Sequence, residues 1–384
     1  AYTQTEFDSM AEYNDAAIIV IGRSGSESVD LPVDYLSFTD EERNLIEMAQ
    51  GRFDKIVLVL NVTNPINMTE IARYDIDAVL WVGALGQEGA YAVGEALNGT
   101  VNPSGHLVDT WAVDPAGSPA AANLGDYTIT NSNVTSGNKY IVYAEGIYVG
   151  YRYYETRYED AVLGQGNAGD YDYDAQVVYP FGYGLSYTDF TWSDYKMTET
   201  ANGFALNVTV KNTGSAAGKD VVQAYLQSPY TDYDKANGIE KSAVELVGFA
   251  KTDILQPGES QTVTIDVDKS TLKVFDTYGE GTYIVEAGDY YLTAAANAHA
   301  AANNILAAKG AAVDGSADFT ALYTQAATDT KTYATAETGA AVTTLMSDAD
   351  IKTYDPDFTY LSRSDWTGTW PATYQNGSWD APET

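Results

Sequence analysis

One glutamate, Glu27, lies in a short polar stretch whose position in the chain suits proton transfer. The stretch IGRSGSESVDLP runs from Ile21 to Pro32 and follows an apolar run that predicts a strand. Glu27 is its only glutamate. It comes after the carboxyl end of that strand, the edge at which α/β sheets bind ligands. A carboxyl group held there could act as a general acid or base. A solvated loop glutamate is the ordinary alternative, and the loop alone does not separate the two.

Other reactive side chains lack the spacing of a catalytic or metal site. The two histidines, His106 and His299, are far apart and fall in different predicted domains, so we expect neither a histidine triad nor a metal centre. We assign Glu145 to a structural contact, with Arg152 as a candidate partner. The acidic stretches lack the spacing of a calcium loop, and the glycine-rich turns do not follow the dinucleotide fingerprint. We therefore expect no cofactor and no metal.

Composition narrows the class of protein. The 384 residues contain 20 Lys and Arg against 54 Asp and Glu, for a net charge of −34, which makes nucleic acid an improbable partner. There is no cysteine, so disulfides and thiolate sites are excluded, while secreted and cytoplasmic locations both remain open. No apolar run approaches the ~20 residues of a membrane helix. The 31 Tyr and 6 Trp suit sugar contacts, and equally a β-sandwich without a ligand.

The elements that would position Glu27 alternate between strand and helix. Thr39 and Glu42 form a possible capping box for one helix, and Gly51 stands where that helix should stop. Buried strands alternating with helices predict an α/β layer with parallel strands covered on both faces. The predicted strands are 16–21, 55–61, 77–83 and 105–111, and the predicted helices are 39–51 and 86–99.

The second half of the chain follows a different pattern. Residues 120–190 are rich in Tyr and Gly, and we expect irregular structure with short strands there. From about 190 to 296, apolar and polar residues alternate in short segments broken by turns, which predicts a β-sandwich of about 100 residues. After about 300 the periodicity is weak, and we expect a tail with little structure of its own.

Several motifs resemble glycoside hydrolase family 3, the β-glucosidase and β-xylosidase family. GQEGAYAVGEALNGTVNPSGHL and YPFGYGLSYTDF are similar to the C-terminal half of that family. NVTVKNTGSAAGKDVVQAYLQSP and ELVGFAKTDILQPGES resemble its fibronectin type III-like domain. The motifs occur in the family's order and cover roughly residues 10–300. The resemblance implies an α/β fold class: an α/β sandwich with a mostly parallel sheet (1–186), a fibronectin type III-like sandwich (187–300) and an irregular tail (301–384).

The resemblance also implies a role for Glu27. The family's acid/base loop follows a strand and reads much like Gly-Arg-x-Ser-Gly-Glu-x-x-Asp, and the stretch from Gly22 to Asp30 resembles it. It departs from the family's pattern at Ser26, where Gly is common, and at Leu31, where Arg is common. Glu27 falls on the acid/base position of a retaining glycosidase. The substrate would be a terminal β-D-glucosyl residue, with β-xylosides as the alternative. The resemblance places the residues that bind the sugar mostly on the family's barrel and assigns none in this chain.

The family's nucleophile is an aspartate on a barrel, and a barrel of eight βα units needs about 250 residues. Only three or four such units precede the predicted sandwich. The triplet Ser364 to Trp366 matches the family's Ser-Asp-Trp nucleophile motif, but it lacks a preceding strand, and we interpret it as unrelated. We expect the front portion of a permuted enzyme whose barrel is cut off or lies on a second polypeptide. A carbohydrate-binding or purely structural subunit is the alternative.

Overall fold

The computed structural model describes residues 3–10, 12–13, 15–23, 32–123, 143–353 and 356–366, with the backbone alone at 127–129, 139–140 and 378–379. The chain divides into two compact units, and each is described by itself. The first unit is Ala1–Pro103, Asp109–Gly117 and Asp174–Tyr179. The second unit is Ser104–Val108, Ser118–Tyr173 and Pro180–Thr384.

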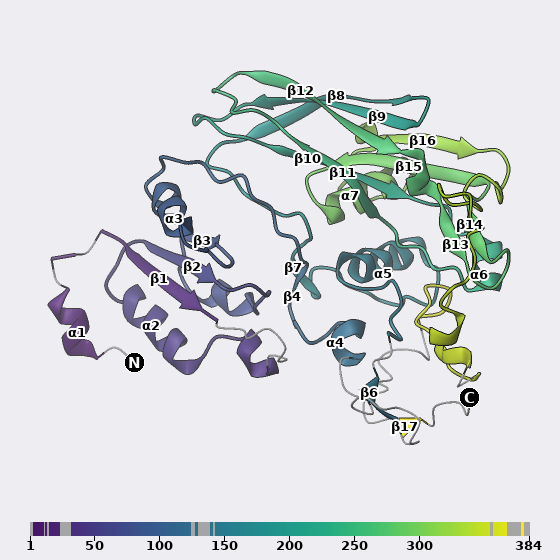
Figure 1. The fold of residues 1–384 in the computed structure, drawn as a ribbon. Coiled ribbons are helices and arrows are strands. Elements are labelled where there is room, and N and C mark those ends of the chain that lie inside the picture. The colour runs from purple at the N-terminus through teal and green to yellow at the C-terminus, as the bar shows by residue number, and fades with distance from the viewer. Residues whose placement is uncertain are drawn as a thin grey trace. The chain divides into compact units, whose positions relative to one another are not determined.

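The first unit is built on a parallel sheet, as the alternating pattern predicts. Its three strands are β1 (Ala17–Gly22), β2 (Ile56–Asn61) and β3 (Ala78–Trp81), paired in parallel in the order β1-β2-β3 (Figure 1). β2 and β3 lie within the predicted strands, and β1 extends one residue past its predicted end, to Gly22. Because the strands are parallel, their carboxyl ends meet at one edge, and the stretch that contains Glu27 leaves β1 at that edge.

Helix α2 (Asp40–Gln50) begins at the expected capping box. The backbone N of Glu42 donates to Thr39 Oγ1 at 3.2 Å, and the backbone N of Thr39 donates to Glu42 Oε2 at 2.8 Å. Of the predicted strand at 105–111, only Trp111 is in a strand, because β4 (Trp111–Ala112) is short and pairs with β7 (Val177–Tyr179) in antiparallel fashion. The other elements of this unit are α1 (Gln4–Ser9), η1 (Val33–Leu36), η2 (Thr69–Arg73), α3 (Gly89–Leu97), β4 (Trp111–Ala112) and β7 (Val177–Tyr179).

Strand β1 is buried on one face only, which corrects the expectation that both faces are covered. Ile19 and Ile21 point into the core, with 5% and 1% of their surface exposed. Ile18 and Val20, on the opposite face, are 53% and 61% exposed. An unbroken apolar run shows that a strand can be buried on both faces, but packing against α2 buries the residues of only one.

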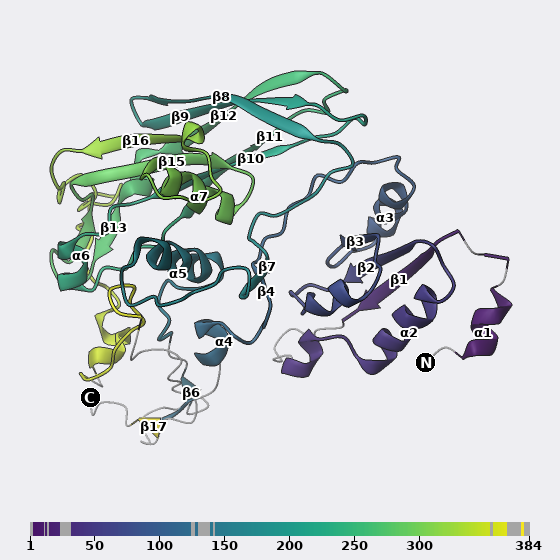
Figure 2. The ribbon, with the colours of Figure 1, turned by 180° about the vertical axis from the view of Figure 1, so that it is seen from behind.

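The second unit contains the predicted β-sandwich (Figure 2). One antiparallel sheet has the order β12-β9-β8, and the other has the order β11-β10-β15-β16. The strands are β8 (Phe190–Glu199), β9 (Gly203–Asn212), β10 (Val221–Gln227), β11 (Glu245–Lys251), β12 (Ser260–Asp268), β15 (Gly288–Ala295) and β16 (Thr320–Gln325). Alternate residues of both sheets form one core, which includes Leu206, Val208, Val222 and Leu292. The period of two in the sequence produces this core because alternate strand residues face the same side.

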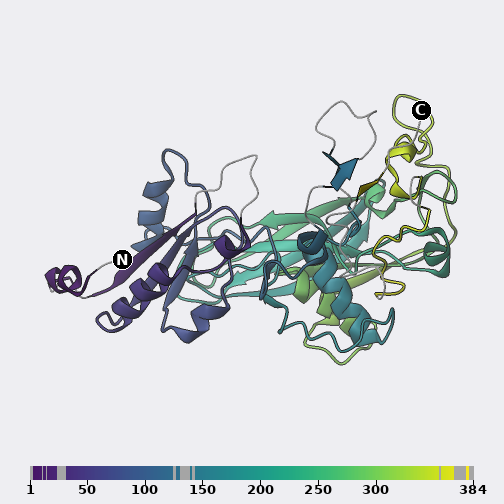
Figure 3. The ribbon, with the colours of Figure 1, turned by 90° about the horizontal axis from the view of Figure 1, so that it is seen from below.

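Two helices lie where the sequence predicts irregular structure. α5 (Tyr151–Leu163) falls inside the stretch 120–190, and α7 (Ala298–Ala308) crosses residue 300. They pack against each other, and α7 also contacts β15 and β10 of the second sheet; both helices lie in front of that sheet when the molecule is seen from below (Figure 3). α5 buries polar as well as apolar residues, among them Glu155, Glu159 and Asp160, so its apolar periodicity is weak. β16 also extends a sandwich sheet from within the expected tail, and the boundaries at 186 and 300 remain predictions.

The remaining elements of the second unit are short. They are α4 (Pro119–Asn123), β5 (Tyr127–Ile129), β6 (Lys139–Tyr140), α6 (Asp232–Asn237), η3 (Lys269–Leu272), β13 (Val274–Asp276), β14 (Thr282–Ile284), η4 (Ala317–Phe319), η5 (Ser347–Ala349), η6 (Ile351–Thr353) and β17 (Ser378–Trp379). Within the part of the chain that the structure describes, no helix combines the length and apolarity needed to cross a bilayer.

Candidate functional site

The loop that contains Glu27 is described at its two ends, while Glu27 itself lies outside the described residues. β1 brings the chain to Gly22, and Arg23 is the last described residue before the loop. The chain is described again from Pro32, whose carbonyl accepts a hydrogen bond of 2.9 Å from the backbone N of Tyr35 in η1. The structure therefore shows how the two ends of this loop are attached.

The side chain of Arg23 fastens the start of the loop to two other segments. Its Nε donates to Tyr35 O at 3.0 Å, and its Nη2 donates to Ser37 O at 2.9 Å. Both Nη atoms donate to the Glu42 carboxylate, Nη2 at 2.8 Å. Only 3% of the Arg23 side chain is exposed. The hydrogen bond that Arg23 donates to Glu42 raises the pKa of Arg23, so the guanidinium keeps its charge.

Glu42 serves two structures at once. Its Oε2 accepts from the backbone N of Thr39 as part of the α2 capping box and also accepts from Arg23 Nη2. The sequence identifies the capping box from the spacing of Thr39 and Glu42. It carries no comparable signal for the ion pair, because Arg23 and Glu42 are 19 residues apart and meet only after β1 and α2 have packed.

An aromatic side chain, that of Trp81, lies at the carboxyl end of β3. Trp81, the last residue of β3, donates from Nε1 to Val62 O at 2.6 Å and makes an edge contact with Trp111 at 6.0 Å between ring centroids. The backbone N of Arg23 donates to Asn61 O at 3.2 Å, which joins the start of the loop to the end of β2. The indole of Trp81 is partly exposed, and such a ring can pack against the face of a sugar.

The Ser-Asp-Trp triplet lies in the second unit and does not end a barrel strand. Asp365 is exposed in a turn, and its Oδ1 accepts from Asn167 Nδ2 at 3.1 Å. Trp366 is buried and donates from Nε1 to Asp160 Oδ2 at 2.8 Å. No strand precedes the triplet among residues 356–361.

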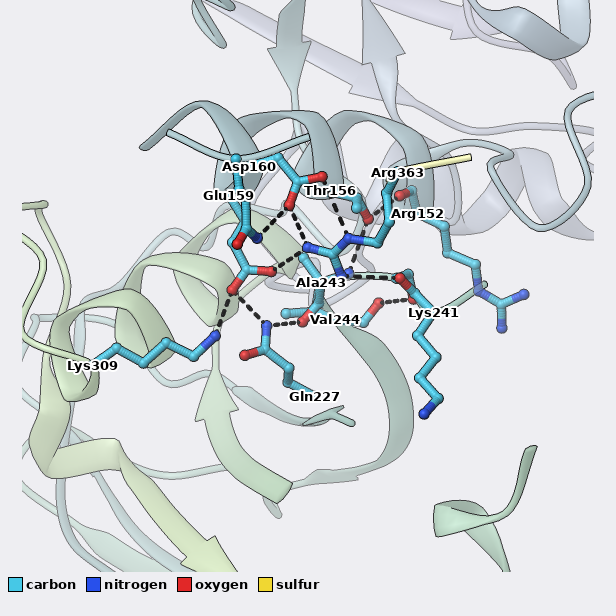
Figure 4. A network of polar contacts seen from close by, with 12 residues as sticks. Arg152, Thr156, Glu159, Asp160, Gln227, Lys241, Ala243, Val244, Lys309 and Arg363 are labelled. Carbon is cyan, nitrogen blue, oxygen red and sulfur yellow. Dashed lines mark hydrogen bonds and ion pairs between the residues drawn. The ribbon is translucent and has the colours of Figure 1, made fainter. Parts of the chain in front are cut away.

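Arg363, just before the triplet, enters a buried network of charges that the sequence analysis missed (Figure 4). Its guanidinium pairs with Asp160 and Glu159 of α5, and its Nη1 donates to Lys241 O at 3.0 Å. Lys309, the C-cap residue of α7, adds a second cation, at 2.8 Å from Glu159 Oε1. The side chains of Arg363, Glu159 and Asp160 are each at most 3% exposed.

The carboxylates of this network are not available to a substrate, because each of their oxygens accepts a hydrogen bond within the protein. Glu159 accepts from Gln227 at 2.8 Å as well as from Lys309 and Arg363, and Asp160 accepts from Gln165, Trp366 and Arg363. Burial raises the pKa of Asp160, while the cations around Glu159 outweigh its burial and lower its pKa. Two adjacent acids on one helix are no signal of such a site, since most acid pairs are solvated.

The prediction that Arg152 is the partner of Glu145 is wrong. Buried Glu145 accepts from Asn123 Nδ2 at 2.9 Å, whereas Arg152 pairs with Glu245 at 3.5 Å. Arg152 lies on α5, and its side chain is 41% exposed. The buried hydrogen bond from the Asn123 amide is consistent with a structural role for Glu145.

The two histidines lie in the same compact unit but at separate places in it. His299 Nδ1 lies 2.9 Å from Glu155 Oε2, and its ring stacks on Tyr173 at 3.7 Å. His106 lies at another place, on the wall of a cavity beside Gly184. Among the described residues, no group of three or more His, Asp or Glu is arranged to hold a metal ion.

Two family models match the chain in the order that the motifs predict. The glycosyl hydrolase family 3 C-terminal domain matches residues 2–151, and the fibronectin type III-like domain matches residues 220–298. A β-glucosidase from Ruminococcus albus is 35% identical over 297 residues, covering 76% of this chain and 28% of the relative. β-Glucosidase A from Butyrivibrio fibrisolvens is 33% identical over 324 residues, covering 73% and 36%. The chain thus spans about a third of the length of these curated relatives.

Solved structures agree with this assignment. β-Glucosidase 3B from Thermotoga neapolitana, solved with α-D-glucose, superposes with a TM-score of 0.65 at 28% identity, over 85% of this chain and 40% of that one. A β-glucosidase from Paenibacillus barengoltzii gives a TM-score of 0.65 at 30% identity, over 85% and 32%. The chain therefore belongs to glycosyl hydrolase family 3, of which it contains the C-terminal domain followed by a fibronectin type III-like domain.

Proposed function

We propose that this chain is part of a retaining β-glucosidase that hydrolyses terminal, non-reducing β-D-glucosyl residues. Glu27 is the acid/base residue, and the aspartate nucleophile is supplied by a barrel outside these 384 residues. Family membership and the names of the relatives support the reaction class. The observation that supports the role of the loop is the hydrogen bonding of Arg23, the residue before the loop. Its guanidinium donates to Tyr35, Ser37 and Glu42.

The proposed chemistry requires two carboxyl groups in different states. The nucleophile must be ionised, and the acid/base group must be protonated so that it can protonate the leaving oxygen. In retaining enzymes the two carboxyl groups lie about 5–5.5 Å apart. A glutamate remains protonated near neutral pH only when burial or a neighbouring carboxylate raises its pKa. A barrel that covers the loop and brings its aspartate close to Glu27 would supply both effects.

Substitution of the acid/base residue gives the sharpest test. In the protein together with its barrel, Glu27→Gln should lower kcat/KM on aryl glucosides with poor leaving groups by about 10²–10⁴-fold. Activated aryl glucosides, whose leaving oxygen needs little protonation, should be cleaved with a much smaller loss in the first step. A plot of rate against leaving-group pKa for both enzymes separates the two cases.

The matched control is Glu47→Gln, which removes an exposed carboxylate of α2 and should leave both rates unchanged. An equal loss on activated and poor leaving groups would contradict an acid/base role for Glu27. Near-normal turnover of substrates with poor leaving groups by Glu27→Gln would also contradict the assignment.

The presence of a barrel is tested by a separate measurement. Native mass spectrometry of the purified protein, followed by a denatured mass, should reveal a polypeptide of barrel size, about 250 residues or more, either joined to this chain or travelling with it. If neither is found in an active preparation, the division of the two carboxyl groups between this chain and a barrel is wrong. A carbohydrate-binding or structural subunit would then describe the chain better.

The substrate sugar is tested by comparing nitrophenyl glycosides. One relative, 29% identical over 290 residues, is named an exo-α-(1→6)-L-arabinopyranosidase, so the family relatives include a pentose enzyme. We expect the β-D-glucoside to have the highest kcat/KM. A higher value for the β-D-xyloside or the α-L-arabinopyranoside would reassign the substrate and leave the mechanism intact.

A further inference from the structure

The second unit contains a cavity of about 640 Å³ that the proposed reaction does not use. Its walls come from the chain around Ser104, the segment 184–192 that enters β8, the end of β15, and the connection from α7 to η4. The volume lies within the about 300–1,000 Å³ typical of small-molecule sites. Lys251 of β11 holds one wall, because its Nζ donates to Ser104 O at 2.8 Å and to Ser104 Oγ at 3.1 Å.

One side of the cavity is a fixed aromatic surface. Trp192 of β8 donates from Nε1 to Asp220 Oδ2 at 2.6 Å, which fixes the orientation of its ring. Phe319 of η4 meets the indole edge-on at 6.2 Å, and both rings line the cavity. A ring held by a hydrogen bond and by packing loses little conformational freedom when a ligand covers it.

Polar groups on the other sides are available to a ligand. Asp189 and Asp314 are exposed, and neither carboxylate has a hydrogen bond or ion pair with another described residue. Lys219 also lines the cavity without such a partner among the described residues. Carboxylates accept hydrogen bonds and an ammonium group donates them, so a ligand with hydroxyl groups can satisfy both.

The charge of the lining excludes anionic ligands. Three carboxylates, those of Asp189, Asp220 and Asp314, outnumber two ammonium groups, that of Lys219 on the lining and that of Lys251 bound to Ser104. Burial lowers the pKa of His106, so its imidazole adds no positive charge near neutral pH. A phosphate or carboxylate ligand would meet net repulsion, whereas a neutral polyhydroxylated ligand would not.

We propose that this cavity is a binding site for a neutral oligosaccharide, in which a sugar ring packs on Trp192 and Phe319 and its hydroxyl groups donate to Asp189 and Asp314. Aromatic faces with adjacent hydrogen-bond acceptors match the two sides of a sugar, which presents C–H groups on its faces and hydroxyls at its rim. The site adds glycan binding to the proposed hydrolysis. Only the choice of a glucose oligomer as the probe rests on the proposed function.

The test is isothermal titration calorimetry of the 384-residue chain with cellotetraose, and separately with xylotetraose, at up to about 10 mM. We expect saturable binding of at least one of the two. The double variant Asp189→Asn, Asp314→Asn should weaken it by about tenfold or more, because it removes two charged acceptors. Ala296→Trp places a bulky ring at an exposed position on the cavity wall and should abolish binding.

Two exposed residues that do not line the cavity provide matched controls. Asp318→Asn removes a nearby carboxylate, and Ala312→Trp adds the same bulk outside the cavity. Both should bind within about twofold of the unchanged chain, and melting temperatures should show that all four variants are folded. Because no turnover is measured, binding can succeed while the proposed hydrolysis fails, and the reverse.

The proposal is overturned if neither oligosaccharide binds at about 10 mM, or if Ala296→Trp binds as tightly as Ala312→Trp. It is also overturned if the acidic lining selects a cation, so that spermidine binds and both sugars do not. Binding of xylotetraose alone supports the site and argues against a glucosyl substrate class for it.

Discussion

Arg23 acts as the fastening point of the loop that contains Glu27. Its donor atoms reach two backbone carbonyls from the segment around η1 and the carboxylate of Glu42 at the start of α2. A guanidinium can serve these acceptors together because its donors are fixed in one plane, an arrangement that a lysine ammonium group cannot reproduce. The start of the loop at Arg23 is therefore coupled to the packing of α2 on β1.

Replacement of this arginine should destabilise the first unit. Arg23→Met leaves Glu42, which is 17% exposed, without its cation and leaves the carbonyls of Tyr35 and Ser37 without a donor. We expect the free energy of unfolding to fall by about 2–4 kcal/mol, measured by urea denaturation. Arg23→Lys should recover only part of the loss, because it keeps the charge without the paired donors.

Arg73→Met is the control for this change, since Arg73 is exposed at the end of η2 and its removal should cost less than about 0.5 kcal/mol. If Arg23→Met were as mild as Arg73→Met, the hydrogen bonds of Arg23 would contribute no net stability. The loop would then have to be held by other contacts.

At the scale of elements, α5 joins the sandwich to the segment 356–366. Besides the Arg363 network, the backbone N of Leu361 donates to Ala144 O at 2.8 Å, and the backbone N of Trp366 donates to Gly166 O at 3.0 Å. Gly166 has a φ of +65°, and a Cβ there would lie 2.2 Å from Arg363 O. Only glycine allows so close an approach, so Gly166 permits the backbone of the segment 356–366 to pack at this position.

Loss of Arg363 should be costly, and the cost should depend on pH. Arg363→Met leaves Glu159 and Asp160 buried, with Lys309 as the remaining cation at Glu159, and we expect a loss of about 3–5 kcal/mol near pH 8. Burial raises the pKa of Asp160 even with Arg363 present, and the variant should raise it further. A carboxyl group whose folded pKa exceeds its unfolded value destabilises the protein progressively as pH rises between the two.

The loss in Arg363→Met should consequently be smaller at pH 5 than at pH 8, by urea denaturation at both values. Arg152→Met, which breaks an exposed ion pair from the same helix, should cost about 0–1 kcal/mol at either pH. A loss in Arg363→Met that is the same at both pH values would mean that Asp160 does not take up the proton.

At the scale of the whole molecule, the net charge of −34 is the largest electrostatic feature. Repulsion among so many carboxylates opposes the compact state, and salt screens exposed charges over about 10 Å at 0.1 M. Raising sodium chloride from about 10 mM to about 0.3 M should therefore raise the melting temperature by about 2–5 °C in a scanning calorimeter.

An uncharged osmolyte at the same osmolality is the control, since it stabilises without screening. A fall in melting temperature with salt would show that attractive pairs, such as Arg23–Glu42 and Arg43–Glu70, outweigh the general repulsion.

The sequence alone predicts what depends on neighbours along the chain and on periodicity. The three parallel strands, the capping box of α2 and the antiparallel sandwich follow from apolar runs, from residues three apart and from a period of two. The motifs also predict the family, and the family comparisons confirm it. The role of Glu27 remains a prediction, because the loop has no local feature that separates a catalytic glutamate from a solvated one.

The tertiary structure alone decided the contacts between distant segments. Arg363 meets Asp160 across 203 residues, and Trp192 meets Asp220 on the cavity wall. α5 escaped prediction because the charges and hydroxyls that it buries find partners on other elements, so that its pattern along the sequence does not look like a buried helix. The spacing of apolar residues along the chain predicts which face of an element is buried. A buried charge is stable only beside a partner of opposite charge or a hydrogen-bond partner, and folding brings that partner from a distant part of the chain. The spacing of residues within one element therefore does not predict the partner.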